Sequence, residues 1–564
     1  MLFRSNRYGG DLLFQNKREK VSYLIGLDYN RNTFDGSARE ESSTRHQDIE
    51  SYINMSGDRN RGRRSSGLRG NVEWNAGDSD ILTVDGRYGG GEWGGDSNRD
   101  YKQWTDADIE PNYYLSFDES ERSGSRFGLN LSWLHRFSRK DHEITGQVHY
   151  GRHDGDELTF NELRNANLEI TDGMRSFERG PSSDLRIKVD YTLPFNDQRK
   201  FEAGYQSEID KSTEDTGAEE FDPSVGRYVE LANYAHTTVY DRATHALYTI
   251  YSHSLGNLGV QGGLRAERTD RNVELKNGSQ KATINRWDLF PSLHISYQLG
   301  NSRQAMASYS RRIERPRGFQ LEPFLTWRDA YNVWTGYPAI QPEYIHSYEV
   351  GYSMPVGNSM FSTELYYRES VNKIEWVRSV YGDNVTLHTV DNVGTDYALG
   401  TELMIDTDIG KFWNLGLTGN LYDYRIEGER YGESFSRQSF NWSTRMNNTF
   451  KLTKTLQLQL TGRYNSPTVS AQGRREGFFL TDVALRKDFF DKVMSLTVQM
   501  RDLFGQARWE FTSQGPDFYS YSNFSRQSRI VMVNLRVNIN NYKQNNERNG
   551  NGEMNGGGGE GGDF

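Results

Sequence analysis

The stretch from Arg529 to Ile539 reads Arg-Ile-Val-Met-Val-Asn-Leu-Arg-Val-Asn-Ile. Every second residue from Val531 to Ile539 is apolar, and Asn534, Arg536 and Asn538 lie between them. Successive side chains on a strand point to opposite faces, so this strand has one apolar and one polar face. The apolar face needs either a second sheet, as in a soluble sandwich, or lipid, as in a transmembrane barrel with a wet interior.

The same alternation recurs along most of the chain. Between Leu185 and Leu193, apolar residues alternate with Arg186, Lys188 and Asp190. Similar segments begin near Leu258, Trp413, Leu456 and Leu496. Charged residues on the face opposite the apolar one require water, whereas a sandwich would bury apolar side chains there. The pattern therefore favours a transmembrane barrel.

Short and long connections also alternate. Ten short polar turns lie near 16–19, 77–80, 138–141, 196–199, 256–257, 300–301, 357–358, 410–411, 453–454 and 491–492. Ten longer polar connections lie near 35–48, 93–110, 156–166, 213–228, 271–281, 314–342, 379–386, 427–435, 468–476 and 507–524. Short turns on one side and long loops on the other are typical of outer-membrane barrels.

The composition agrees with this interpretation. Only 35% of the 564 residues are hydrophobic, yet 13% are aromatic, which suits a large barrel with a thin apolar band and aromatic girdles. So many aromatic residues argue against a disordered chain. The absence of cysteine excludes disulfides and thiolate metal sites. We expect no metal site and no cofactor, and without a basic stripe we expect no nucleic-acid partner.

The predicted strands number about 21, an odd count. Bacterial single-chain barrels are antiparallel and have even strand numbers, so one strand is expected to be missing before residue 5. The alternative is that the count of strands is off by one. The complete wall would then be of the 22-strand type found in plugged transporters. We therefore expect an N-terminally incomplete barrel domain at residues 1–540. Residues 541–564 are rich in Asn, Gly and Glu and are expected to form a disordered periplasmic tail.

Four segments resemble one known family. They are Phe290-Pro291-Ser292, then Tyr-Ser-Arg-Arg-Ile-Glu-Arg-Pro at 309–316, Gly-Tyr-Pro-Ala-Ile-Gln-Pro-Glu at 336–343, and Ser-Tyr-Glu-Val-Gly-Tyr at 347–352. Together they are similar to the barrel portion of TonB-dependent receptors, in the outer-membrane β-barrel family. Tyr337 departs from the pattern, which usually has Asn there.

The resemblance implies a multi-pass β-barrel in the bacterial outer membrane that takes up a small ligand into the periplasm. It also implies energy from the TonB–ExbB–ExbD complex, acting through a plug domain and TonB box that are not in this sequence. A passive pore and a surface adhesin or structural barrel are the alternatives.

Candidate ligand contacts lie in the long connection 314–342, which carries Trp327, Tyr331, Trp334 and Tyr337. Exposed aromatic side chains can anchor ligands, although packing within the loop is an equally good interpretation.

An acidic run from Asp210 to Asp222 either attracts cations or is a solvated surface loop. The chain has no Gly-x-Ser-x-Gly motif, and no base can be placed beside a serine, so we expect no enzyme and no catalytic residues.

Overall fold

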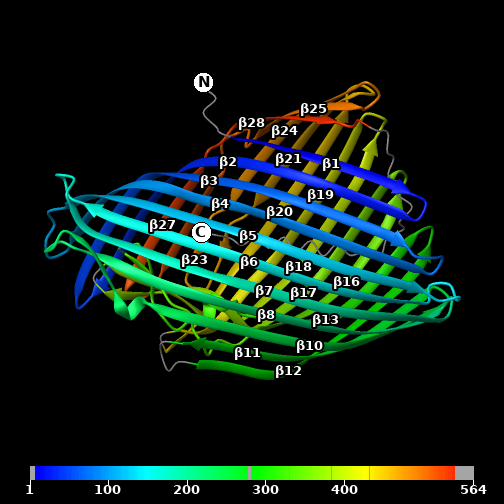
Figure 1. The fold of residues 1–564 in the computed structure, drawn as a ribbon, viewed down its shortest axis with the longest axis horizontal. Coiled ribbons are helices and arrows are strands. Elements are labelled where there is room, and N and C mark those ends of the chain that lie inside the picture. The colour runs from blue at the N-terminus through cyan, green and yellow to red at the C-terminus, as the bar shows by residue number, and fades with distance from the viewer. Residues whose placement is uncertain (1–6, 277–280, 330, 383, 431, 540–564) are drawn as a thin grey trace.

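The chain forms an all-β barrel. The computed structural model describes residues 7–276, 281–329, 331–382, 384–430 and 432–539, so the expected tail lies outside the described residues. The described chain contains 28 strands in one sheet and two short 3₁₀ helices, η1 (Ala232–Tyr234) and η2 (Gly318–Leu321) (Figure 1). No helix among these residues is long and apolar enough to cross a membrane.

Twenty-one strands form the wall, each paired antiparallel with the next. They are β1 (Tyr8–Arg18), β2 (Val21–His46), β3 (Ile49–Asn75), β4 (Asp80–Thr105), β5 (Asn112–Arg136), β6 (Glu143–Arg164), β7 (Ile170–Asn196), β8 (Arg199–Asp222), β10 (His236–Leu255), β11 (Leu258–Leu275), β12 (Lys281–Gly300), β13 (Arg303–Glu314), β16 (Glu343–Val356), β17 (Ser359–Gly382), β18 (Val385–Ile409), β19 (Trp413–Arg430), β20 (Glu433–Lys451), β21 (Leu456–Asn465), β24 (Phe478–Phe489), β25 (Met494–Arg501) and β28 (Ile530–Val537).

The other seven strands account for the difference between the expected count of about 21 and the observed 28. They are β9 (Arg227–Glu230), β14 (Thr326–Asp329), β15 (Asn332–Trp334), β22 (Thr468–Val469), β23 (Gly473–Arg475), β26 (Arg508–Gln514) and β27 (Phe518–Arg526). All of them lie within or beside connections that the sequence marked as long and polar. Five of them have only two to four residues, too few to show a sustained alternation of apolar and polar side chains.

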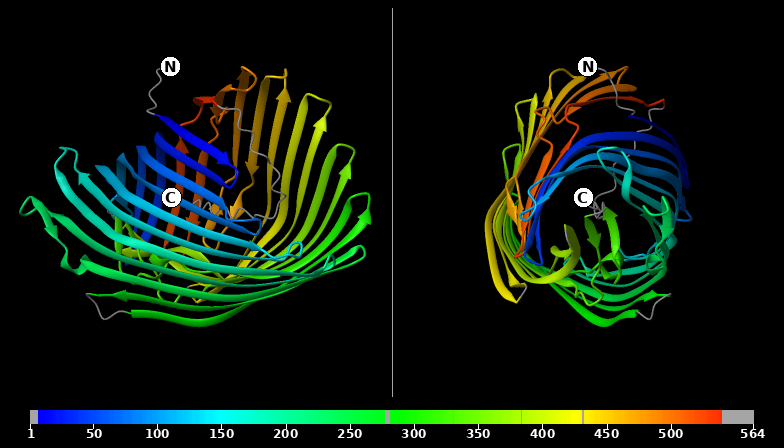
Figure 2. Two further views of the ribbon diagram at one scale, coloured as in Figure 1. Left: turned by 45° about the vertical axis from the view of Figure 1, so that its right-hand side comes forward. Right: turned by 90° about the vertical axis from the view of Figure 1, so that its left-hand side faces the viewer.

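The two ends of the wall meet through a loop strand. The outer half of β2, Gly36–Thr44, pairs with β27, which pairs with β26. β1 covers only the inner half of β2, from Val21 to Arg31. Viewed along its length, the wall forms a ring around the interior (Figure 2).

Several expected loops are continuous strand instead. The connections expected near 35–48, 93–110, 156–166, 213–228 and 271–281 are largely absorbed into the long hairpins β2–β3, β4–β5, β6–β7, β8–β9 and β11–β12. β2 and β3 are joined by a tight turn at Gln47 and Asp48, both with positive φ. The wall therefore extends well past the apolar band on its outer side, with water on both faces.

The apolar band lies on the outside of the wall. Val72, Val84, Leu131 and Val148 are direct cross-strand partners, and each is 38–45% exposed. The band ends on its outer side in an aromatic edge formed by Tyr29, Tyr88, Phe127 and Tyr150, all exposed. Exposed apolar rows with an aromatic border are the lipid-facing surface of an outer-membrane barrel.

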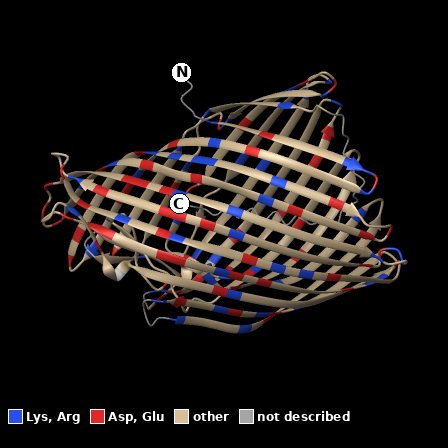
Figure 3. Ribbon diagram, viewed as in Figure 1, with Lys and Arg blue, Asp and Glu red and all other residues tan. Residues whose placement is uncertain are grey.

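The opposite face of the wall carries charges. Lys188 forms an ion pair with Asp190 at 3.0 Å, and Arg186 pairs with Glu208 at 2.9 Å. Figure 3 shows Lys and Arg interleaved with Asp and Glu along the strands. The predicted alternation of a lipid-facing and a water-facing side is thus confirmed.

Candidate functional site

The connection 314–342, here called the crossing loop, enters the lumen from β13. Arg315 is ion-paired with Glu267 on β11 and donates to Thr269 at 3.4 Å. Arg271, also on β11, donates to the carbonyl of Pro316 at 3.2 Å. Because these partners line the inner face, the loop starts out by folding inward.

A small apolar core holds the loop against the wall. Leu321 and Ile340 are 1% and 0% exposed, and they pack with Val273 on β11 and Val390 on β18. Gly336 lies so close to the segment 320–322 that a Cβ there would approach the Glu322 nitrogen to 2.6 Å. The loop is therefore internally compact and needs glycine at that position.

An interior segment of the crossing loop adds a strand to β18. β15 pairs in parallel with Thr386–His388, and the indole of Trp334 stacks on His388 with centroids 4.6 Å apart. His388 Nε2 lies 2.8 Å from Asn332 Oδ1. Trp334 also meets Trp376 on β17 edge to face at 4.6 Å.

The residue next to β15 reaches the far side of the barrel. Tyr331 packs against Tyr101 on β4 and Tyr114 on β5, with centroids 5.5 and 5.9 Å apart. Counted around the wall, β5 is the fifth strand and β18 the fifteenth of 21, so they lie opposite each other. The crossing loop consequently spans the lumen near its outer mouth.

A second bridge crosses beside it, made by the residues around β22 and β23. The Gln472 side chain accepts from the Arg378 backbone nitrogen at 2.7 Å and donates to the Arg378 carbonyl at 2.9 Å. The guanidinium of Arg378, on β17, donates to Ser520 on β27 at 3.0 Å. Because β27 pairs with β2, this bridge also joins opposite walls.

In the structure, the four predicted aromatic residues of the crossing loop do not form one exposed cluster. Trp327 donates to Tyr234 at 3.0 Å, whereas Tyr331 and Trp334 pack as described. Tyr337 is 44% exposed. Three of the four side chains thus dock the loop, and their contact with a ligand stays a prediction.

The acidic run is not a surface loop, which corrects that interpretation. Asp210–Asp222 belongs to β8, and Glu214 lies on the inner face opposite Thr238 of β10. Burial, reinforced by the nearby carboxylates of Glu178 and Glu322, raises the pKa of Glu214 to about 9. Glu322 belongs to the crossing loop, so the wall and the loop face each other here with carboxyl groups.

The pKa of His388 is shifted in the opposite direction to that of Glu214. Burial, helped by the charge of Arg378, lowers the pKa of His388 to about 3. The imidazole under Trp334 is therefore neutral at physiological pH.

These two groups predict that docking of the crossing loop depends on pH. The burial that the docked loop provides and the nearby Glu322 carboxylate both raise the pKa of Glu214 from an ordinary 4.5 towards about 9, so docking is strongest below pH 4.5 and weakens as pH rises from 4.5 to 9. The pKa of His388 falls from 6.5 to about 3, so its contribution is full above 6.5 and is lost as pH falls towards 3. Protease cleavage within 314–342 is expected to be slowest between about pH 4.5 and 6.5.

Glu214→Gln mimics the protonated carboxyl, so it should flatten the alkaline limb of that profile and leave the acid limb unchanged. A wild-type cleavage rate that is flat from pH 4 to pH 10 would contradict the prediction.

Comparison with known proteins agrees with this geometry. Residues 135–537 match the family described as outer membrane protein beta-barrel family. No curated protein sequence matches the chain significantly.

Solved structures that share the fold include those of two transporters and a siderophore receptor. The ferric citrate transporter FecA in its unliganded form matches with a TM-score of 0.57 at 13% identity, covering 92% of this chain and 78% of FecA. The copper transporter OprC gives 0.58 at 11% identity, covering 88% and 83%. The siderophore receptor PiuA from Acinetobacter baumannii gives 0.52 at 10% identity, covering 89% and 86%.

Proposed function

Since the chain belongs to the outer membrane protein β-barrel family, we propose that it is a receptor and transporter that moves a small ligand across the bacterial outer membrane. The crossing loop is the observation that supports this most. A loop spanning the lumen obstructs free diffusion, so passage requires that it move, and a ligand held at the mouth is positioned to bias that movement.

Energised uptake is part of the proposal. Solved proteins of the same fold carry the names of transporters for ferric citrate and copper and of a siderophore receptor. We propose that this chain likewise works with the TonB–ExbB–ExbD complex through a plug and TonB box. The ligand would enter between the crossing loop and the wall, and the charged lumenal face would line its path.

A comparison of wild-type cells with a strain lacking this gene tests the proposal without knowledge of the ligand. Mass spectrometry of the medium should reveal at least one component that the deletion strain consumes more slowly. A protonophore should abolish that difference, because TonB-linked uptake draws on the proton gradient. A difference that survives the protonophore would favour a passive pore. No difference at all would favour an adhesin or structural barrel.

Tyr337 is the sharpest probe of ligand contact among the four aromatic residues. Its ring is 44% exposed, so Tyr337→Ala should remove a contact surface without undocking the loop. We expect a several-fold rise in the KM for uptake of the component so identified, with the maximal rate preserved, because stacking on an aromatic ring contributes about 1 kcal/mol.

Trp334→Ala provides the comparison, since it removes the stack on His388 and should change the maximal rate as well. An unchanged KM in Tyr337→Ala would remove that residue from the ligand site.

A further inference from the structure

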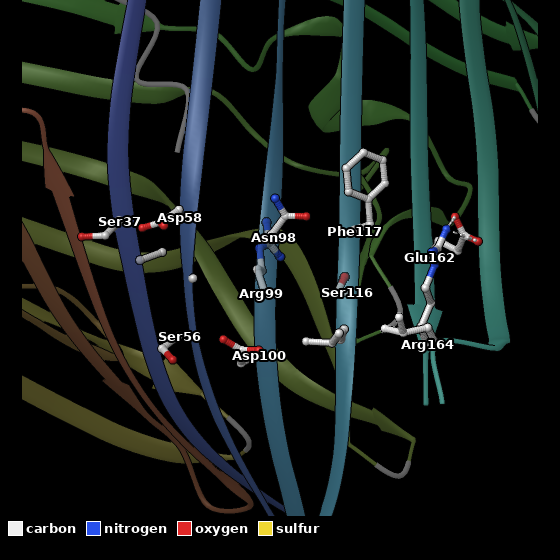
Figure 4. Close-up of a pocket in the computed structure, with 14 residues that line it drawn as sticks. Ser37, Ser56, Asp58, Asn98, Arg99, Asp100, Ser116, Phe117, Glu162 and Arg164 are labelled. Atoms are coloured by element: carbon white, nitrogen blue, oxygen red, sulfur yellow. Dashed lines mark hydrogen bonds and ion pairs between the residues drawn. The ribbon is translucent and has the colours of Figure 1, made fainter. Parts of the chain in front are cut away.

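A recess lies away from the lumen, on the outer face of the wall and beyond the aromatic edge. It has a volume of about 930 Å³ and crosses β2 to β6 (Figure 4). Two cross-strand rows form it. One row is Ser37, Asp58, Asn98, Phe117 and Glu162, and the other includes Ser56, Asp100, Leu115 and Arg164.

These rows belong to the outer face of the wall. Asp58, Asn98 and Phe117 each lie ten residues from a lipid-facing residue of their own strand, namely Leu68, Tyr88 and Phe127. An even separation on an unbroken strand keeps side chains on the same face, and the pairings here have no register shift. The recess is therefore about 33 Å along the strands beyond the lipid band, at ~3.3 Å per residue.

The polar side chains at the centre of the recess have hydrogen-bonding capacity left for a ligand. Within the described chain, Asp58, Asn98 and Asp100 make no side-chain hydrogen bond or ion pair with another described residue. Some charges elsewhere on the same outer surface are paired. Examples are Arg39 with Glu41 at 2.6 Å, Arg64 with Glu92 at 2.5 Å, and Arg152 with Asp154 at 2.9 Å. Asp58, Asn98 and Asp100 thus keep their polar atoms available to a ligand.

One end of the recess is rigid. Glu162 is 4% exposed and holds Arg164 at 3.2 Å through both carboxylate oxygens. Beside it, the Phe117 ring is braced edge to face by Phe160 at 6.2 Å. Leu115 and Leu168 add apolar surface at this end. A fixed aromatic ring next to fixed charges is how a binding site achieves orientation.

We propose that this recess binds a neutral saccharide. Sugar hydroxyls both donate and accept, and the recess offers carboxylate acceptors, amide and guanidinium donors, and the hydroxyls of Ser37 and Ser56, which do both. Phe117 supplies a face for the C–H side of a sugar ring. Asp58, Asp100 and Glu162 outnumber Arg164 on this face, which disfavours an anionic ligand.

This site is separate from uptake through the lumen and goes beyond the proposed function. The saccharide has two possible sources. One is the sugar portion of glycolipid in the surrounding outer leaflet, and the other is a free oligosaccharide. Both present the same hydroxyl chemistry, and the test distinguishes them.

The test uses the full chain in detergent micelles, probed with an array of neutral oligosaccharides and with vesicles containing lipopolysaccharide from the producing bacterium. Asp58→Ala, Asn98→Ala and Asp100→Ala are combined in one variant. We expect its Kd to rise about 10-fold or more, because hydrogen bonds to charged groups are among the strongest in proteins. The matched control is Arg152→Ala with Asp154→Ala, an outer-face pair whose loss should leave Kd unchanged.

Binding to the array that is lost in the triple variant supports a free oligosaccharide. Binding to the vesicles alone, lost in the same variant, supports a glycolipid anchor. Wild-type protein that binds neither probe overturns the proposal, as does binding that the triple variant and the control weaken equally. Heat-modifiable migration on gels confirms that each variant retains the barrel.

Discussion

Replacing Val148 by arginine is expected to destabilise the folded barrel by about 2–4 kcal/mol, the range for an arginine facing lipid near the bilayer midplane. Val148 is 38% exposed and is flanked in the same row by Leu131 and Ile187. A guanidinium at this position leaves water for hydrocarbon unless it reaches the interface. Urea titration of the barrel refolded into lipid vesicles measures the change.

The adjacent residue provides the control. Gln147 is exposed on the opposite face, where its cross-strand partners are Ser132 and Lys188. Gln147→Arg puts the same side chain into the wet interior and should change stability by well under 1 kcal/mol, apart from weak repulsion by Lys188. Equal destabilisation by the two variants would mean that the assignment of the two faces is wrong.

The alternation of apolar and polar side chains was predictable from sequence wherever lipid and water lie on opposite sides of a strand. In β28, Val531, Val533, Leu535 and Val537 are 44–67% exposed, as their spacing indicated. The ten short turns were predictable for a different, local reason, since Gly, Asn and Asp favour the backbone conformations of tight turns. Turn residues with positive φ include Gly256, Gly357 and Gly410.

The outer extension was not predictable in this way. Beyond the lipid band both faces of a strand meet water, so segments such as Asp58–Arg64 carry no apolar alternation. Their strand structure depends on backbone pairing, for example of Asp58 with Asn98. The hydropathy of the side chains carries no information about that pairing. These segments therefore resembled loops, and the seven loop strands were missed by the same criterion.

The candidate site was half predictable. The crossing loop and its aromatic residues stood out in the sequence, because aromatics are unusual in a polar connection. Their partners did not, since Tyr101 and His388 are distant in sequence and meet the loop only once the barrel closes. Glu214 was misread for a related reason. The run it belongs to is acidic enough to suggest solvent, and only the pairing of β8 with β10 places this carboxyl inside.

Ile340→Asp is expected to release the crossing loop and open the lumen. Ile340 is 0% exposed in an apolar cluster with Leu321, Val273 and Val390. Truncating such a side chain costs about 2–5 kcal/mol, and an unpaired carboxylate adds a further desolvation cost. The wall itself should survive, because its strands are held by backbone ladders to which the loop adds only β15. Planar-bilayer recordings should show a low-conductance wild type and a steady, much higher conductance in the variant.

Tyr337→Asp is the matched control, since it adds the same charge to the same loop at a position that is 44% exposed. It should leave the conductance near the wild-type value. If Ile340→Asp folds normally and conducts no more than the wild type, the crossing loop does not obstruct the lumen. The second bridge at Arg378 would then be the obstruction to test next. A high conductance in the wild type would instead support the passive pore, because the same apolar cluster would then be holding the loop beside the path of ions rather than across it.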